Sequence, residues 1–445
     1  MDVIDRFADF AAHIAPPEAA LAAARLCLLD WYGAAIAGSG EMPAAALRRV
    51  LPGDGPSRLI PDGAGRDPRT AALINGTASH IVEVDDIYRP GLYHPGVVTI
   101  PAALALAETE NASAGHMLRG IIAGYEVGNR IAQAINPAHY RHWHTTGTVG
   151  HFGAATAGAT VLGLNADQTA HALATAATMA AGLRHAFSSD AMSKPLHAGR
   201  AAEAGVLCAL AARHGATGVR SILNADSGFI AAMADEVNWA IALEDLGTDW
   251  TICNTTPKAH ACCGHNFAAL DAVRHLVQMH AVEAEDIQVI DVATYRAALE
   301  ICGNPDPRSA AEGRFSLPWC AAVMAVEGSV TPAAFSDDSL GDKRIRDLAG
   351  RVALMIDEEA EAKFPNARSA TVILHLKDGR NVKQHRPTRK GDPDDPLSDT
   401  DLISKFSALS TPVIGQSAAD SLANSILNLS LEDSTHGLRV RDLSD

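Results

Sequence analysis

Histidine, lysine and arginine side chains gather at four places where helical sequence patterns are interrupted. The first place is the segment 83–95 (EVDDIYRPGLYHP), which holds three carboxylates together with Arg89 and His94. The others are the segments Tyr140–Gly147, Met192–Arg200 and Lys258–His265. Cations can clamp carboxylates, and an imidazole can move a proton near neutral pH. These residue types therefore suit proton abstraction from a carbon beside a carboxylate, where negative charge develops and must be stabilised.

The segment 83–95 is expected to be a bent loop between two buried helices. Pro90, Gly91 and Pro95 exclude a continuing helix. The flanking runs Thr70–Val82 and Val97–Glu108 are apolar and helical in character. Ionisable groups so close to a core are costly unless they are paired or used. The alternative is an acidic loop that is simply solvated.

Composition limits the kinds of ligand and the size of the fold. A chain of 445 residues exceeds one ordinary core, so two domains are expected. The hydrophobic fraction is 47% but aromatic residues make up only 5%, which favours closely packed Ala- and Gly-rich helices. The formal net charge of −16 argues against nucleic acid and anionic membrane as partners. An anionic substrate would therefore need a local cluster of cations.

Cysteine usage and the N-terminus predict a cytoplasmic protein. The seven cysteines are an odd number and lie mostly in apolar runs, as reduced buried thiols do. The first residues carry no basic region typical of a signal peptide. Residues 145–164 lack Asp, Glu, Lys and Arg, but they are rich in Gly, Ala and Thr and contain His151. We therefore expect a tightly packed buried helix there rather than a membrane span.

Hydrophobic periodicity predicts a mainly α protein with a large all-helical domain and a smaller α+β lid domain. We assign residues 1–254 and 397–445 to the all-helical domain and residues 255–396 to the lid. The expected helices of the first domain are Val3–Ala15, Glu18–Ala37, Thr70–Val82, Val97–Glu108, Ala112–Ile135, Gly147–Leu164, Ala166–Leu183, Ala198–His214, Val219–Leu223, Leu402–Leu409 and Ser417–Leu427. Asp30, inside an apolar helix, is expected to be a structural acceptor.

The lid shows both helical and strand patterns. Strands are expected at Ile287–Tyr295, Val352–Ile356 and Ala370–Leu376, with a hairpin turn at Lys377–Arg380 and a return at Asn381–Lys383. Helices are expected at Asn266–His280 and Leu317–Val326. Leu51–Arg69 is predicted to be a surface connection and Pro387–Pro396 a linker, because both are rich in turn-forming residues. Ser398–Asp401 resembles a helix N-cap.

Sequence motifs exclude several common kinds of site. The chain contains no GxGxxG, GxxxxGK[ST], GxSxG or HExxH. Cys262, Cys263, His260 and His265 could be considered as metal ligands, but adjacent cysteines suit one tetrahedral ion poorly and no CxxC pair accompanies them. We therefore expect no metal. A metal-dependent hydrolase and a non-enzymatic helical interaction protein remain as alternatives from other functional classes.

The order of several short motifs resembles the MmgE/PrpD family, which includes 2-methylcitrate dehydratase, cis-aconitate decarboxylase and iminodisuccinate epimerase. The resemblance covers nearly the whole chain. It rests on Leu29–Gly33 (LDWYG), Asn75–Thr77 (NGT), the His80–Asp86 run, Gly124–Gly128 (GYEVG), Gly150–Ala155 (GHFGAA), the Lys194–Arg200 segment and Lys390–Pro393 (KGDP). It implies a cofactor-free homodimer, with the site between the helical domain and the lid.

By this resemblance, four residues are catalytic. His94 matches the histidine of the family's His-Pro loop, His144 matches its second histidine, and Lys194 and Lys258 match its two lysines. We expect Arg89 to help the lysines stabilise developing charge. The expected substrate-binding residues are Arg89, Glu83, Tyr88, Met192, Cys263 and His265. The partner expected is a small anionic carboxylate substrate.

The resemblance to the decarboxylase members differs at three hydroxyl or carboxylate positions. Glu83 stands where those members have a loop aspartate, Ile87 where they have the following threonine, and Trp319 where they have a lid tyrosine. Cys263 falls near a lid histidine. With several proton donors retained and these hydroxyls lost, we favour an epimerase of the iminodisuccinate type. A 2-methylcitrate dehydratase and then a cis-aconitate decarboxylase are the alternatives.

Overall fold

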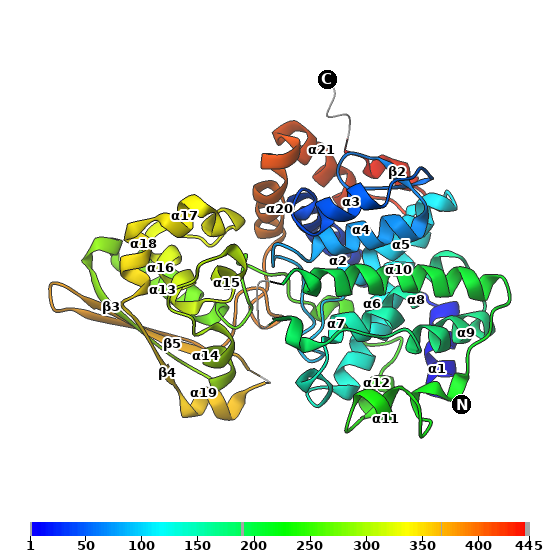
Figure 1. The fold of residues 1–445 in the computed structure, drawn as a ribbon, viewed down its shortest axis with the longest axis horizontal. Coiled ribbons are helices and arrows are strands. Elements are labelled where there is room, and N and C mark those ends of the chain that lie inside the picture. Colours follow the sequence, from blue (N-terminus) through cyan, green and yellow to red (C-terminus); the bar gives the residue numbers. More distant parts are fainter. Residues whose placement is uncertain (1, 188–190, 366, 441–445) are drawn as a thin grey trace.

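The computed structural model describes residues 2–187, 191–365 and 367–440, and it has a large helical part beside a smaller α+β part (Figure 1). The mainly α class expected from periodicity is confirmed. The helical part contains α1 (Val3–Ala12), α2 (Glu18–Gly38), α3 (Ala44–Val50), α4 (Pro68–Ser79), α5 (Gly96–Thr109), α6 (Ala114–Ile135), α7 (Thr145–Thr148), α8 (Gly150–Val161), α9 (Ala166–Ala177), α10 (Ser193–Arg213), α11 (Phe229–Met233), α12 (Trp239–Leu243), α20 (Asp399–Ile414) and α21 (Gln416–Leu427).

Helices α4, α8 and α10 lie very close together because glycines stand where they touch. A Cβ on Gly199 of α10 would overlap Thr77 of α4, and one on Gly205 would overlap Ala154 of α8. The Ala- and Gly-rich composition therefore allows these helices to pack densely. This packing holds the first turns of α10 against the last turn of α4.

The α+β part is built on a four-stranded sheet with the order β4-β3-β5-β6. Strand β3 (Ile287–Thr294) pairs in parallel with β4 (Val352–Ile356) and antiparallel with β5 (Ala370–Leu376), and β5 forms the predicted hairpin with β6 (Asn381–Arg386). Along β5, buried residues alternate with partly exposed ones, as expected for a strand with one covered face.

Helices cover this sheet and complete its core. Helices α13 (Phe267–His280) and α16 (Leu317–Glu327) contact the sheet, and Phe267 and Trp319 are buried with residues of β3 and β5. The remaining helices are α14 (Arg296–Cys302), α15 (Ala310–Arg314), α17 (Asp337–Gly341), α18 (Lys343–Ala349) and α19 (Glu358–Lys363).

The chain returns to the helical part through α20, which packs against α2. Ser398 and Asp401 form a capping box: the Ser398 hydroxyl accepts from Asp401 N–H at 3.1 Å, and the Asp401 carboxylate accepts from Ser398 N–H at 3.0 Å. Lys405 on α20 donates to Asp30 at 2.5 Å and to the carbonyl of Val84 at 2.7 Å. Asp30 is therefore a structural acceptor, as expected, and α20 supports the 83–95 loop.

Two predicted connections hold more buried polar groups than their composition indicates. Within Leu51–Arg69 the strands β1 (Ser57–Arg58) and β2 (Gly65–Arg66) pair, and Arg58 is buried in an ion pair with Glu108. Within Pro387–Pro396, Arg389 is fully buried and its guanidinium binds the carboxylate of Asp392 at 2.6 Å. Pro- and Gly-rich composition marks irregular backbone, but a buried ion pair can hold such backbone inside the protein.

The helix α2 is the one described helix that is long and apolar enough to cross a membrane. In the structure 72% of its most apolar window is buried, against α4, α6 and α20 among others. The uncharged run at 145–164 forms α7 and α8, and nearly all of it is buried as expected.

Candidate active site

The residues 80–95 connect α4 to α5 and carry several of the reactive side chains. The backbones of Ile87 and Thr256 exchange two hydrogen bonds of 2.8 Å, which join this loop to the segment that carries Lys258. Glu83 (φ 58°) and Leu92 (φ 48°) adopt the left-handed conformation, which is strained for residues other than glycine. The loop is therefore held in one shape by its tertiary contacts.

A single buried carboxylate, Asp85, binds three charged or chargeable groups. Its Oδ2 lies 2.8 Å from His80 Nδ1 and 2.7 Å from His94 Nδ1, and its Oδ1 lies 3.5 Å from Lys258 Nζ. Burial alone would raise the pKa of Asp85, but Lys258 and the two histidines hold it well below its usual value. Asp85 thus stays ionised and orients both imidazoles through the same ring nitrogen.

A second buried carboxylate, Glu83, brings two lysines together. Lys258 Nζ lies 2.9 Å from Glu83 Oε2, and Lys194 Nζ pairs with Oε1. Burial opposes ionisation of Glu83, but the two lysines lower its pKa strongly. Burial likewise disfavours the ammonium of Lys258, yet Asp85 and Glu83 raise its pKa above its ordinary value. Lys258 is therefore a fixed positive charge on the site.

Lys194 lies between the helical and α+β parts. Its ammonium stands 5.5 Å from the ring centroid of Phe187 in the helical part and 5.5 Å from that of Phe315 in the α+β part. Cations bind the faces of aromatic rings within this range, and the rings also exclude water from the ammonium. The site is therefore formed by both parts of the chain.

Four imidazoles form a row beside the lysines. The rings of His80 and His144 stack with centroids 5.5 Å apart, His94 lies 5.0 Å from His80, and His144 Nδ1 lies 3.2 Å from His197 Nδ1. Burial lowers the pKa of His80 to about 4 and places that of His144 well below its usual value. Both rings are neutral at pH 7, so each has one nitrogen that donates and one that accepts a proton.

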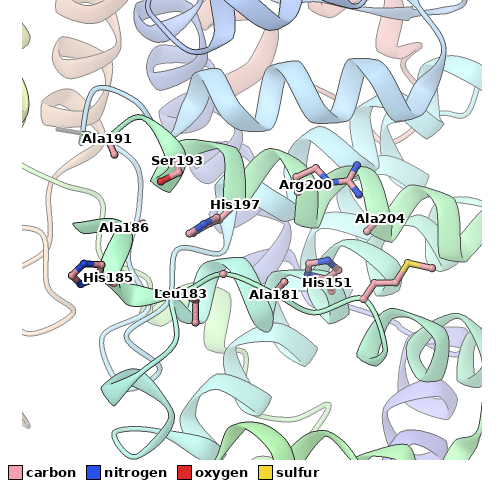
Figure 2. Close-up of a pocket in the computed structure, with 12 residues that line it drawn as sticks. His151, Ala181, Leu183, His185, Ala186, Ala191, Ser193, His197, Arg200 and Ala204 are labelled. Atoms are coloured by element: carbon pink, nitrogen blue, oxygen red, sulfur yellow. The ribbon is translucent and has the colours of Figure 1, made fainter. Parts of the chain in front are cut away.

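A cavity of about 1020 Å³ lies next to this row. His197 and Arg200 of α10 line it with His151 of α8, and the segment 181–186 forms another wall (Figure 2). His197 borders this cavity and also contacts His144. The cavity therefore gives a small molecule space close to the imidazole row.

Both parts of the chain match models of known protein domains. The model of the MmgE/PrpD N-terminal domain matches residues 5–242, and that of the MmgE/PrpD C-terminal domain matches residues 260–431. The chain belongs to the MmgE/PrpD family. The expected family is thus confirmed.

Three curated relatives in this family carry related names. The chain is 27% identical over 443 residues to the cis-aconitate decarboxylase-like protein oryM of Aspergillus oryzae, covering 93% of the chain and 91% of that protein. It is 27% identical over 393 residues to cis-aconitate decarboxylase of Homo sapiens, covering 82% and 78%. The corresponding protein of Mus musculus is also 27% identical over 393 residues, covering 82% and 77%.

The structure brings together five of the residues assigned from the sequence. His94, His144, Lys194, Lys258 and Glu83 meet around the Asp85 carboxylate and the imidazole row. They come from segments as far as 175 positions apart in the sequence. This convergence in an MmgE/PrpD protein agrees with a shared site, and their catalytic and binding roles stay predictions.

Four other predicted binding residues have other partners or are exposed. Arg89 pairs with Asp392 at 3.2 Å and with Asp394 at 3.3 Å. The Tyr88 hydroxyl donates to Gln133 at 2.8 Å. His265 Nδ1 lies 2.8 Å from the Tyr295 hydroxyl, and the side chain of Met192 is exposed. These four residues are not among the direct partners of Glu83 and Asp85.

Sequence reasoning missed roles for His80, Asp85 and His197. His80 lies at the end of an apolar helix, where a histidine usually belongs to the core, and Asp85 is one of several acids in its loop. His197 has no role of its own in the sequence pattern of Met192–Arg200, yet its Nδ1 lies 3.2 Å from His144 Nδ1. A useful signal is the spacing of His80 and Asp85, five residues apart across the helix end.

At two positions where the decarboxylase members are expected to carry a hydroxyl, this chain has Trp319 and Ile87. Trp319 is fully buried in the α+β core and its indole N–H donates to the carbonyl of Ala334 at 3.2 Å. Ile87 is buried and apolar. Any general acid must therefore come from other groups, such as the imidazoles or the lysines.

His80, Asp85 and His94 are the described residues that could hold a metal ion, because their ligand atoms lie within 4.8 Å of one another. Their distances fit shared protons better. Both imidazoles already lie at hydrogen-bond distance from one carboxylate oxygen, and Lys258 places a positive charge 3.5 Å from the other. An ion would have to separate these contacts and would meet repulsion from Lys258.

Cys263 stands beside the lysine cluster and is only half-buried. Its backbone N–H donates to the carbonyl of Arg314 at 2.9 Å. The Cys302 thiol donates to its sulfur and lowers the pKa of Cys263 to about 7, against the opposing effect of burial. A substantial thiolate fraction is thus present at neutral pH.

We expect iodoacetamide to alkylate Cys263 with a rate that reaches half its maximum near pH 7, because the thiolate is the reacting form. Peptide mass spectrometry after timed alkylation measures this. Cys253 is an internal control: it is exposed, but burial of its sulfur raises its pKa, so its rate should rise only at higher pH. Equal pH profiles for the two cysteines would contradict the assignment.

Proposed function

We propose that this MmgE/PrpD protein is a cofactor-independent acid/base enzyme that moves a proton at a carbon beside a carboxylate of a small di- or tricarboxylate. The observation that carries this proposal is the convergence of Lys194 and Lys258 on Glu83, next to the imidazole row. Few sites place two fixed ammonium groups beside several imidazoles in a water-poor setting. Such a site suits a reaction that develops negative charge and transfers protons.

The lysines act on the developing charge. Removing a proton, or carbon dioxide, from a carbon beside a carboxylate leaves charge that spreads onto the carboxylate oxygens. Ammonium groups fixed near those oxygens stabilise this charge more than they stabilise the substrate, which is the condition for catalysis. Glu83 holds both ammonium groups in place before substrate binds.

The imidazoles act on the proton. A neutral histidine accepts a proton on one nitrogen while the other stays bound to its partner. His94 Nδ1 faces Asp85 Oδ2 at 2.7 Å, which leaves Nε2 for exchange with a substrate. Asp85 also stabilises the imidazolium that forms. His80 and His144 extend the row toward the cavity beside His197.

This chemistry has three possible outcomes, and different observations support two of them. The names of the curated relatives support a lyase reaction, and cis-aconitate is the substrate that those names suggest. The apolar Ile87 and the buried Trp319 support the epimerase that we favour from the sequence, because that reaction needs two proton donors rather than a hydroxyl acid. A dehydratase is the third outcome.

The test is a product assay with cis-aconitate, 2-methylcitrate and iminodisuccinate offered separately. Carbon dioxide from cis-aconitate identifies the decarboxylase, a new alkene from 2-methylcitrate identifies the dehydratase, and interconversion of stereoisomers of iminodisuccinate identifies the epimerase. Hydrolysis of an unrelated ester or amide by a zinc-loaded protein would instead support the metal-dependent hydrolase. Reaction with none of the three carboxylates would count against the proposal.

A further inference from the structure

Among the described residues, Arg368 in the segment before β5 is a buried cation without an acidic partner. Only 4% of its surface is exposed, and its Nε has no hydrogen-bond partner in the described part of the chain. Within residues 2–187, 191–365 and 367–440, no carboxylate forms an ion pair with it. Burying an unpaired charge is strongly unfavourable in a fold, and an anionic ligand would compensate it.

Arg184 approaches the same place from the helical part. It begins the short 3₁₀ segment Arg184–Phe187, and its guanidinium lies 5.0 Å from the ring centroid of Tyr140. It is partly buried, and in the described part of the chain it likewise forms no ion pair with a carboxylate. Burial lowers the pKa of His265 well below its usual value, and Arg368, Arg389 and Arg184 reinforce this effect. Each of the three arginines is therefore within electrostatic range of this neutral imidazole.

The neighbouring Arg389 differs from Arg368 because its guanidinium has a carboxylate partner. It binds both carboxylate oxygens of Asp392, at 3.0 Å and 2.6 Å, and donates to the carbonyl of Gly264 at 3.1 Å. Arg368 has instead a ring contact with Phe364 at 5.9 Å. A single distant ring compensates a buried guanidinium much less than a bidentate carboxylate does. Arg368 and Arg184 are thus left with binding capacity that Arg389 has used.

The position of this arginine pair links it to the lysine cluster. Arg368 Nη1 lies 4.0 Å from the place that a Cβ on Gly264, the residue after Cys263, would take. The charges of Glu83 and Lys258 also act on the Cys263 thiol. The hydroxyl of Tyr140 is within range of Cys263, Arg184, Arg368 and Glu83. One small molecule could therefore reach the lysine cluster and the arginine pair, with Tyr140 and Cys263 between them.

We propose that Arg184 and Arg368 bind a second carboxylate of the substrate, remote from the reacting carbon, and so select substrates with at least two carboxylates. Guanidinium groups match a carboxylate through paired N–H donors, and two of them compensate its charge. The two arginines come from the helical and α+β parts, so the bound carboxylate joins both. This inference rests on the proposed function and adds the groups that determine substrate class.

The test compares Arg184→Gln and Arg368→Gln with the matched control Arg380→Gln, which changes an exposed arginine in the β5–β6 turn. Tricarballylate, a tricarboxylate, is the binding probe, and isothermal calorimetry on the full chain measures its Kd. We expect each site variant to weaken binding about 10- to 100-fold, the loss typical of a charged hydrogen-bonded contact. The control should bind as the unchanged protein does.

Steady-state kinetics separate this subsite from the chemistry. With a substrate that the product assay identifies, the site variants should raise KM much more than they lower kcat, because the carboxylate they bind is remote from the reacting carbon. Arg184 is partly exposed, so Arg184→Gln keeps the test decisive where Arg368→Gln does not fold.

Each outcome bears on one of the two proposals. Unchanged Kd and KM in Arg184→Gln would overturn the arginine subsite while turnover by the unchanged protein supports the proposed function. Failure of the unchanged protein to bind tricarballylate would also overturn the subsite. Binding of tricarballylate without turnover of any of the three carboxylates would overturn the proposed function and leave the subsite supported.

Discussion

Replacing Asp85 by Asn should lower kcat/KM by about 10²- to 10⁴-fold, the range expected when proton transfer loses its orienting partner. The substitution keeps the shape of the side chain but removes its charge. An amide oxygen cannot hold both His80 Nδ1 and His94 Nδ1 as Oδ2 does, and the new NH₂ group lies near Lys258. Both imidazoles would lose the bond that fixes their tautomer and orientation.

The neighbouring Asp86 provides a matched control for that measurement. Burial raises the pKa of Asp86 to about 7, and its carboxyl accepts from the Tyr125 hydroxyl at 2.7 Å and from Gly96 N–H at 3.0 Å. Asp86→Asn should therefore lower kcat/KM less than about tenfold, a modest effect compared with that of a lost proton-transfer partner. If Asp85→Asn were folded and as active as Asp86→Asn, Asp85 would have no orienting role.

Replacing Lys258 by Met should abolish activity and lower the free energy of unfolding by about 3–5 kcal/mol at pH 7, the usual cost of breaking a buried ion pair. The change leaves Glu83 and Asp85 buried with Lys194 as the remaining lysine partner. Urea unfolding followed by circular dichroism measures the difference between variant and unchanged protein. The double variant Glu83→Gln with Lys258→Met should recover part of the loss, because it removes one uncompensated charge.

The stability difference should depend on pH in a definite direction. Lys258 depresses the pKa values of Glu83 and Asp85 in the folded state, so their contribution is full above the ordinary carboxyl pKa of the unfolded chain, about 4. It is lost as the pH falls from there through the depressed folded values. Unfolding at pH 7 and at pH 3.5 should thus give a smaller difference at the lower pH. An undiminished difference would show that the ion pairs are not its source.

Local patterns in the sequence were enough to predict most helices and the basic groups of the site. The capping residues of α20 and the alternation along β5 depend on near neighbours, so they can be recognised without a structure. Lys194 and Lys258 could be found because each stands in a polar break between apolar runs. Their positions relative to each other could not be found in this way.

Contacts between distant segments account for what was missed. The pairing of Glu83 with Lys258 joins residues 175 positions apart, and no periodicity records it. Asp85 and Asp86 are adjacent acids, but the structure places one beside three basic groups and the other beside a tyrosine. Arg389 stands in a segment whose composition is typical of a linker, and only its pairing with Asp392 explains its burial. Arg368 could be singled out only once the structure showed it buried without an ion-pair partner among the described residues.

The most direct test of the central claim is proton NMR in D₂O with cis-aconitate, citrate, 2-methylcitrate and iminodisuccinate offered separately. Proton transfer at a carbon beside a carboxylate predicts carbon-bound deuterium at that carbon in at least one of them or, for a dehydratase, loss of the proton at that carbon with formation of an alkene. Lys194→Ala should abolish this incorporation, because that ammonium stabilises the developing charge. Folded, unchanged protein that introduces no deuterium into any of the four compounds and removes no water from citrate or 2-methylcitrate would contradict the account.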